Sequence, residues 1–166
     1  MTAAGQNPRM SETKTDPKVL LERRMERALK SGDSARIKMV AALNKDGWSE
    51  EVRGHGVISA ALRGDVGMAE FWIKSLKADP RFADDSALRW ASVLKKDDVT
   101  RFLAQRIFAL RRWKRRGRQA VLKEVEIVRG RIVRSCAELK EPPDVERRAM
   151  EIVEEEAGQL IDRLGV

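Results

Sequence analysis

The sequence RGDVGMAEFWIKSL, at Arg63–Leu76, is followed directly by KADPRFADDSALRWAS, at Lys77–Ser92. The first segment begins near a Gly-Asp pair, a common helix-start signal, and then carries apolar residues at helical spacing. The second contains the turn signal Ala78-Asp79-Pro80, and an apolar stripe follows it. Together the two segments predict a helix, a turn and another helix.

The same kind of helix start occurs three times along the chain. It is found at Gly32-Asp33-Ser34, at Gly64-Asp65-Val66 and at Asp97-Asp98-Val99, with spacings of 32 and 33 residues. A period near 33 residues, with two short helices and a turn in each unit, is typical of stacked helical repeats. Stacking lets such units share a continuous core that no single unit could bury. We therefore expect residues 16–110 to form three helix pairs.

One segment resembles a known repeat family in more detail. Ser86-Ala87-Leu88-Arg89-Trp90-Ala91, which follows the turn at Ala78-Asp79-Pro80, is similar to the Thr-Pro-Leu-His-x-Ala helix start of ankyrin repeats. His55–Ala61 fills the same frame more loosely, and Gly64–Ile73 is similar to the family's second-helix start, but no unit carries the full motif. The resemblance covers about residues 20–110 and implies a short α-solenoid of three ankyrin-like helix pairs.

The ankyrin resemblance implies a function as well as a fold. It implies a non-enzymatic scaffold that binds a protein partner through the hairpin tips and the concave face of the short helices. The candidate protein-binding residues on these surfaces are Trp48, Arg53, Arg81, Phe82 and Arg89. We expect Trp48 to lie in a loop at a hairpin tip, where an exposed tryptophan would act as a binding anchor.

The composition favours an all-α protein. Charged residues make up 36% of the chain, aromatic residues only 5%, and Tyr is absent, so β-strands are poorly supported. We expect no membrane span, because no run of 18 apolar residues is present, and no signal peptide, because the N-terminus lacks an apolar core. The single cysteine, Cys136, excludes an intramolecular disulfide. We therefore expect a cytoplasmic protein.

Residues 111–166 depart from the repeat and contain two further amphipathic segments. The first carries a heptad-like apolar stripe made of Val121, Val125, Val128, Ile132, Cys136 and Leu139. Pro142-Pro143 ends it, and Asp144 is the expected cap of a second helix. We expect a C-terminal hairpin of one basic and one acidic helix, although the same stripes could pair with another subunit of a large assembly. Residues 1–15 read as a tail that is disordered or ordered by a partner.

The sequence contains no recognisable motif for catalysis, cofactor binding or metal binding. His55 is the only histidine and occupies a turn position of the ankyrin frame, and Cys136 lies on an apolar stripe, so we expect structural roles for both. Trp72 and Trp90 also lie on apolar stripes, which predicts that Trp90→Ala destabilises the fold by about 3–5 kcal/mol. We expect neither an enzyme nor a bound cofactor or metal.

The stretch RRWKRRGR, at Arg111–Arg118, is strongly basic. Its cations are Arg111, Arg112, Lys114, Arg115, Arg116 and Arg118. They predict a nucleic-acid site in which the cations bind phosphates and Trp113 stacks on a base. Three other interpretations are open: the cations complement a helix C-terminus, bind an acidic protein, or pair with the last helix. That pairing is reasonable because residues 141–166 carry eight acidic and only three basic residues.

Overall fold

The computed structural model describes residues 16–165, and every regular element among them is a helix. In chain order these are α1 (Pro17–Ser31), α2 (Ser34–Leu43), α3 (Glu50–Arg63), α4 (Val66–Glu70), the π-helical segment η1 (Phe71–Ser75), α5 (Phe82–Val93), α6 (Asp97–Ile107), α7 (Leu110–Trp113), α8 (Gly117–Glu138) and α9 (Pro143–Leu164). The all-α prediction is confirmed for this part of the chain, and the predicted tail lies outside it. None of the described helices combines the length and apolarity needed to cross a bilayer.

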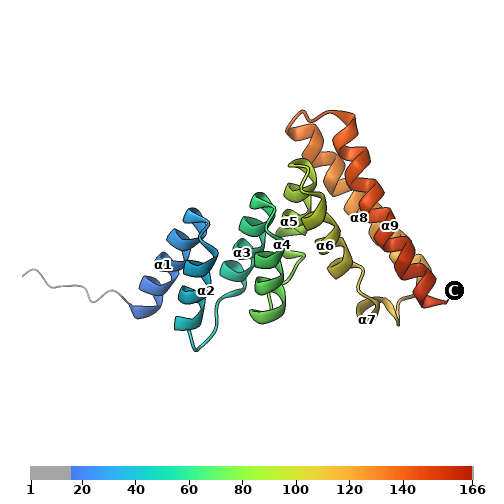
Figure 1. Ribbon diagram of the computed structural model, residues 1–166. Coiled ribbons are helices and arrows are strands. Elements are labelled where there is room, and N and C mark those ends of the chain that lie inside the picture. Colours follow the sequence, from blue (N-terminus) through green and yellow to red (C-terminus); the bar gives the residue numbers. More distant parts are fainter. Residues whose placement is uncertain (1–15, 166) are drawn as a thin grey trace, which may run out of the picture.

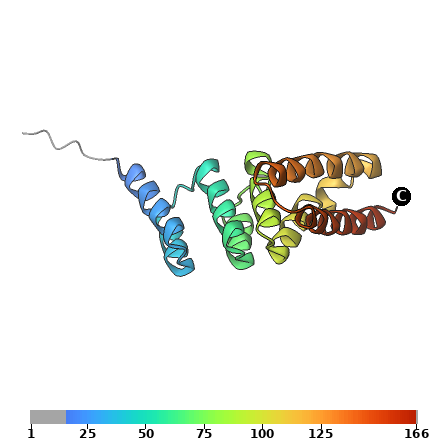
Figure 2. The same cartoon turned by 90° about the horizontal axis from the view of Figure 1, so that it is seen from above.

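The helices are arranged as a row of pairs, with the two long helices at its far end (Figure 1). α1 packs on α2, α3 on α4, and α5 on α6, while α3 and α5 join the second pair to the third. α8 and α9 pack against each other and reach back to the third pair, α8 against α5 and α9 against α6 (Figure 2). The third pair is therefore covered by helices on two sides.

Four helices are capped at their N-termini by a side chain. Asp16 accepts a hydrogen bond from the Lys18 N–H at 2.8 Å and Asp33 from the Ala35 N–H at 3.0 Å. Ser49 accepts from the Val52 N–H at 3.3 Å, and Asp65 accepts from the Met68 N–H at 2.9 Å. These bonds satisfy first-turn N–H groups that have no partner inside the helix.

Two other predicted caps are wrong. The residue before α6 is Lys96, which makes no capping bond, and Asp97 instead accepts a hydrogen bond from Arg148 Nε on α9 at 3.0 Å. α9 begins at Pro143, whose fixed φ suits a first helical position, so Asp144 lies inside the first turn and caps nothing.

The sequence WSEEVRGHG, at residues 48–56, contains two glycines and is nevertheless helical from Glu50 onward. Gly54 and Gly56 are buried inside α3, where a Cβ on Gly54 would overlap the Phe82 ring and a Cβ on Gly56 the Trp72 ring. The two glycines therefore let aromatic rings lie directly against the helix backbone. The stabilisation from packing these rings against α3 offsets the free-energy cost of placing glycine inside a helix.

Three tryptophans of the repeat region have different environments. Trp72 is fully buried, as predicted. Trp48 is only 7% exposed, because its indole folds back on α2 and donates a hydrogen bond to the Ala41 carbonyl at 3.2 Å. Trp90 is 37% exposed, so its predicted place in the core is wrong. α5 turns Ala87, Leu88 and Ala91 toward the core and leaves Trp90 at the surface.

The apolar stripe of α8 is buried within the chain up to Cys136, whereas Leu139, predicted to continue it, is 44% exposed. Burial raises the pKa of the Cys136 thiol, and the nearby Glu146 and Glu141 raise it further. The reactive thiolate is therefore disfavoured, in line with a packing role for this cysteine.

Candidate binding site

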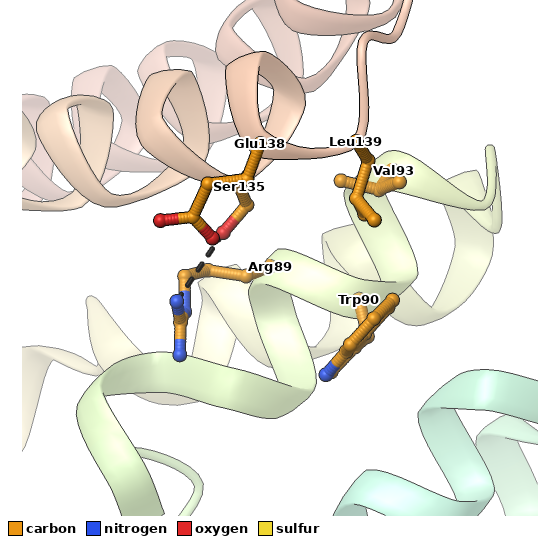
Figure 3. A pocket seen from close by; sticks show the side chains of 6 residues that line it. All are labelled: Arg89, Trp90, Val93, Ser135, Glu138 and Leu139. Atoms are coloured by element: carbon orange, nitrogen blue, oxygen red, sulfur yellow. Dashed lines mark hydrogen bonds between the residues drawn. The ribbon is translucent and has the colours of Figure 1, made fainter.

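A groove of about 120 Å³ lies between α5 and the C-terminal end of α8 (Figure 3). Its lining residues are Arg89, Trp90, Val93, Ser135, Glu138 and Leu139. Trp90 and Leu139 are the exposed apolar side chains of this groove, at 37% and 44%. An exposed tryptophan beside a concave surface is a typical anchor for a binding partner.

Arg89 lies in this groove without a carboxylate partner. Its guanidinium donates hydrogen bonds to Ser135 Oγ at 3.2 Å, Ser86 Oγ at 3.0 Å and the Ala83 carbonyl at 3.3 Å, all of them neutral acceptors. The Nε atom of Arg89 is buried and has no acceptor among the described residues. Glu138 lines the opposite wall without forming an ion pair to Arg89 (Figure 3). The positive charge is therefore available to an anionic group that enters the groove.

Arg81, the residue directly before α5, has the opposite environment because it does have carboxylate partners. It pairs with Asp85, which is fully buried, at 2.8 Å, and also with Glu124 on α8. Arg131 on α8 pairs with the same Asp85. Burial alone lowers the pKa of Arg81, but its hydrogen bonds to Asp85 and Glu124 outweigh this and raise the pKa above the usual value. Arg81, predicted to bind a partner, is thus used to join α5 to α8.

The other predicted protein-binding residues are also engaged within the chain. Arg53 donates hydrogen bonds to the Leu76 and Lys77 carbonyls, both at 3.1 Å. Phe82 is half-buried and packs edge-on against the His55 ring at a centroid distance of 5.6 Å. Trp48 is buried, which contradicts its expected exposure as a binding anchor.

Arg89 is therefore the one predicted protein-binding residue that lines the groove, and sequence reasoning missed its neighbours. Trp90 was misplaced because its apolar character was taken as a sign of burial. On a helical wheel Trp90 lies about 60° from Ala87, on the side away from Leu88, and this position outside the buried arc was the signal that could have placed it at the surface. Leu139 and Ser135 reach the groove only because α8 folds back over α5.

The six cations of the basic stretch are exposed, and they surround a buried aromatic anchor. Trp113 is 1% exposed, donates its indole N–H to the Ile107 carbonyl at 2.7 Å and stacks on Phe108 at a centroid distance of 6.3 Å. Arg116 lies over the same indole at 5.4 Å. The expectation that Trp113 stacks on a nucleic-acid base is therefore wrong.

The acidic residues of α9 pair with other cations. Glu155 and Glu156 pair with Arg101 on α6 at 2.8 and 3.0 Å, and Glu154 pairs with Arg129 on α8. The hydrogen bonds that Arg101 donates to Glu155 and Glu156 raise the pKa of Arg101. Within residues 16–165, no ion pair joins the acidic last helix to Arg111–Arg118, so the expected pairing between them is not found.

The described residues contain no cluster of side chains suited to hold a metal ion. His55 is exposed and lies 3.9 Å from Glu51, and no group of three or more His, Cys, Asp or Glu side chains in residues 16–165 is placed to hold a metal. Comparison of the chain with protein-family models, curated proteins and solved structures finds no match. The function is therefore inferred from the groove and the basic stretch.

Proposed function

We propose that this protein is a non-enzymatic binding module that holds a segment of a protein partner in the groove between α5 and α8. The observation that carries the proposal is the pairing of Trp90, exposed at the surface, with Arg89, which lacks a carboxylate partner. Large aromatic and arginine side chains contribute most of the binding energy in many protein interfaces.

The chemistry of the groove specifies the kind of segment that fits. A carboxylate would form a charge-assisted hydrogen bond with the Arg89 guanidinium, which is stronger than the bonds Arg89 makes to neutral oxygens. A large apolar side chain next to that carboxylate would cover Trp90 and Leu139. The expected ligand is a peptide segment in which Asp or Glu lies next to a Leu, Ile, Met or Phe.

We further propose that the three helix pairs are degenerate ankyrin-like repeats, closed at one end by a hairpin of α8 and α9. Equivalent positions support this: Gly32 and Gly64 end α1 and α3 with φ of 72° and 73°, in the left-handed region that glycine favours. Asp33 and Asp65 follow them and cap the next helices. Ser34 donates a hydrogen bond to Asp65 at 3.2 Å and so links the first pair to the second.

A selection from a random peptide library on the immobilised protein tests the proposed function. The library is first depleted on a Trp90→Ala/Arg89→Gln variant, so that peptides bound elsewhere are removed. The expected result is enrichment of an acidic residue beside a large apolar one. No enrichment, or peptides that bind the variant as well as the wild type, would count against the groove.

A further inference from the structure

We infer that the basic cluster, defined as Arg111, Arg112, Lys114, Arg115, Arg116 and Arg118, is a second binding site, specific for the phosphate backbone of nucleic acid. It is separate from the α5–α8 groove and does not depend on the proposed protein partner. The inference rests on the exposure of these cations, on their lack of acidic partners and on the way Trp113 holds them.

The positive charge of the basic cluster is not compensated within the described part of the chain. All six side chains are exposed, and none forms an ion pair or a side-chain hydrogen bond with another of residues 16–165. The acidic residues of the nearby helix α9 form ion pairs elsewhere: Glu154 with Arg129, and Glu155 and Glu156 with Arg101. α8, which begins at Gly117, has no acidic residue in its first turn and no capping side chain, so its positive dipole end adds to the same field.

Trp113 fixes the position of the basic cluster. Because its indole is buried, hydrogen-bonded to Ile107 and stacked on Phe108, the residues on either side are held close to the protein surface. The chain then turns and enters α8, which begins at Gly117. Cations presented from an anchored turn lose less conformational entropy on binding than cations on a free tail.

The composition of the basic cluster favours nucleic acid over an acidic protein or a membrane. Protein interfaces usually have an apolar centre, and the one large apolar side chain between these cations, Trp113, is buried. Stable membrane association through a basic patch usually requires a second, apolar signal, and Trp113 cannot supply it. Five of the six cations are arginine, whose planar guanidinium matches the two oxygens of a phosphate better than an ammonium does.

The buried indole also predicts how nucleic acid is recognised. With Trp113 unable to stack on a base, binding relies on phosphate contacts and is independent of sequence. Each phosphate neutralised on duplex DNA contributes about −0.9 to the slope of log affinity against log salt. Six contacts therefore predict a slope of about −5 and an affinity loss of about 1,000-fold between 50 and 200 mM salt.

Fluorescence anisotropy with a labelled DNA duplex of about 20 base pairs and random sequence tests the inference. We expect the full-length, nuclease-treated protein to bind this duplex at about 50 mM salt, and a second duplex of unrelated sequence equally well. The Arg111→Gln/Arg112→Gln variant should show a slope about 2 units smaller and correspondingly weaker binding, because each lost phosphate contact lowers the slope by about 1.

The matched control is Arg23→Gln/Arg24→Gln, which removes the same charge from exposed positions on α1. This control should bind the duplex almost as tightly as the wild type. An absence of binding at about 50 mM salt would overturn the inference. So would an equal loss of affinity in the two variants, or binding restricted to vesicles of anionic phosphatidylserine or to an acidic polypeptide such as polyglutamate.

Discussion

Gly56 and Gly130 both lie inside helices, but the structure gives them opposite roles. An added Cβ at Gly56 would overlap the fully buried Trp72 ring, whereas at Gly130 on α8 it would meet no atom within 4 Å. We predict that Gly56→Ala destabilises the fold by about 1–3 kcal/mol through overpacking. Gly130→Ala should instead stabilise it by about 0.5–1 kcal/mol, because alanine is the better helix former.

Urea unfolding of the two variants beside the wild type measures both effects. A Gly56→Ala variant as stable as the wild type would contradict the packing of Trp72 on α3. Destabilisation by Gly130→Ala would contradict the open space around this position on α8.

Trp90 and Trp72 give a second comparison at the residue scale. Because Trp90 is 37% exposed and Trp72 fully buried, we predict that Trp90→Ala changes the free energy of unfolding by less than about 1 kcal/mol, whereas Trp72→Ala costs about 3–5 kcal/mol. Thermal and urea denaturation of the two variants provide the measurement. Equal losses of stability would indicate that Trp90 is buried in the core. The groove would then have no exposed aromatic side chain.

At the scale of elements, Asp85 joins α5 to α8. It is fully buried and pairs with Arg81 and Arg131, and the residues Ala83–Asp85 are all in the left-handed backbone region, with φ between 51° and 59°. Left-handed backbone costs about 1–2 kcal/mol per residue, so the contacts made by this segment must offset that cost.

We predict that Asp85→Asn destabilises the fold by about 3–5 kcal/mol, because it leaves two partly buried guanidinium groups without their shared carboxylate. Asp84→Asn is the matched control: Asp84 also pairs with Arg131 but its side chain is 80% exposed, so its loss should cost less than about 1 kcal/mol. Denaturant unfolding that shows the same small change for both variants would refute the role of Asp85.

The helix caps show which features of these elements could be predicted from the sequence. Asp33 and Asp65 were placed correctly because a cap bonds N–H groups two or three residues away. Asp97 was assigned wrongly because its partner, Arg148, is 51 residues further along the chain. Asp85 likewise bonds Arg131, 46 residues away, so only the packing of α8 on α5 reveals its role.

Each candidate site also has one feature that the local sequence predicts and one that depends on the fold. The basic cluster was predictable as a run of like charges. Its lack of ion pairs with α9 was not predictable, because it depends on the pairing of Glu154–Glu156 with Arg129 and Arg101. Arg89 was predicted from the ankyrin frame. The groove around it was not, since Ser135 and Leu139 arrive from another part of the chain.

On the scale of the whole molecule, α8 separates the two proposed sites. The basic cluster lies at its N-terminal end and the groove at its C-terminal end. The helix has 22 residues, which corresponds to about 33 Å. Charges at that distance are screened at physiological salt, where the Debye length is about 8 Å. We therefore predict that peptide and nucleic acid bind independently, with each affinity unchanged when the other ligand is saturating.

The most direct measurement is the affinity of a fluorescein-labelled peptide, taken from the library selection, for four versions of the full-length protein. By anisotropy, Trp90→Ala and Arg89→Gln should each weaken binding at least about 10-fold, as expected for a loss of about 1.4 kcal/mol or more. Arg111→Gln/Arg112→Gln should bind as the wild type does. Wild-type affinity in both groove variants, or a loss only in the Arg111→Gln/Arg112→Gln variant, would contradict binding in the α5–α8 groove.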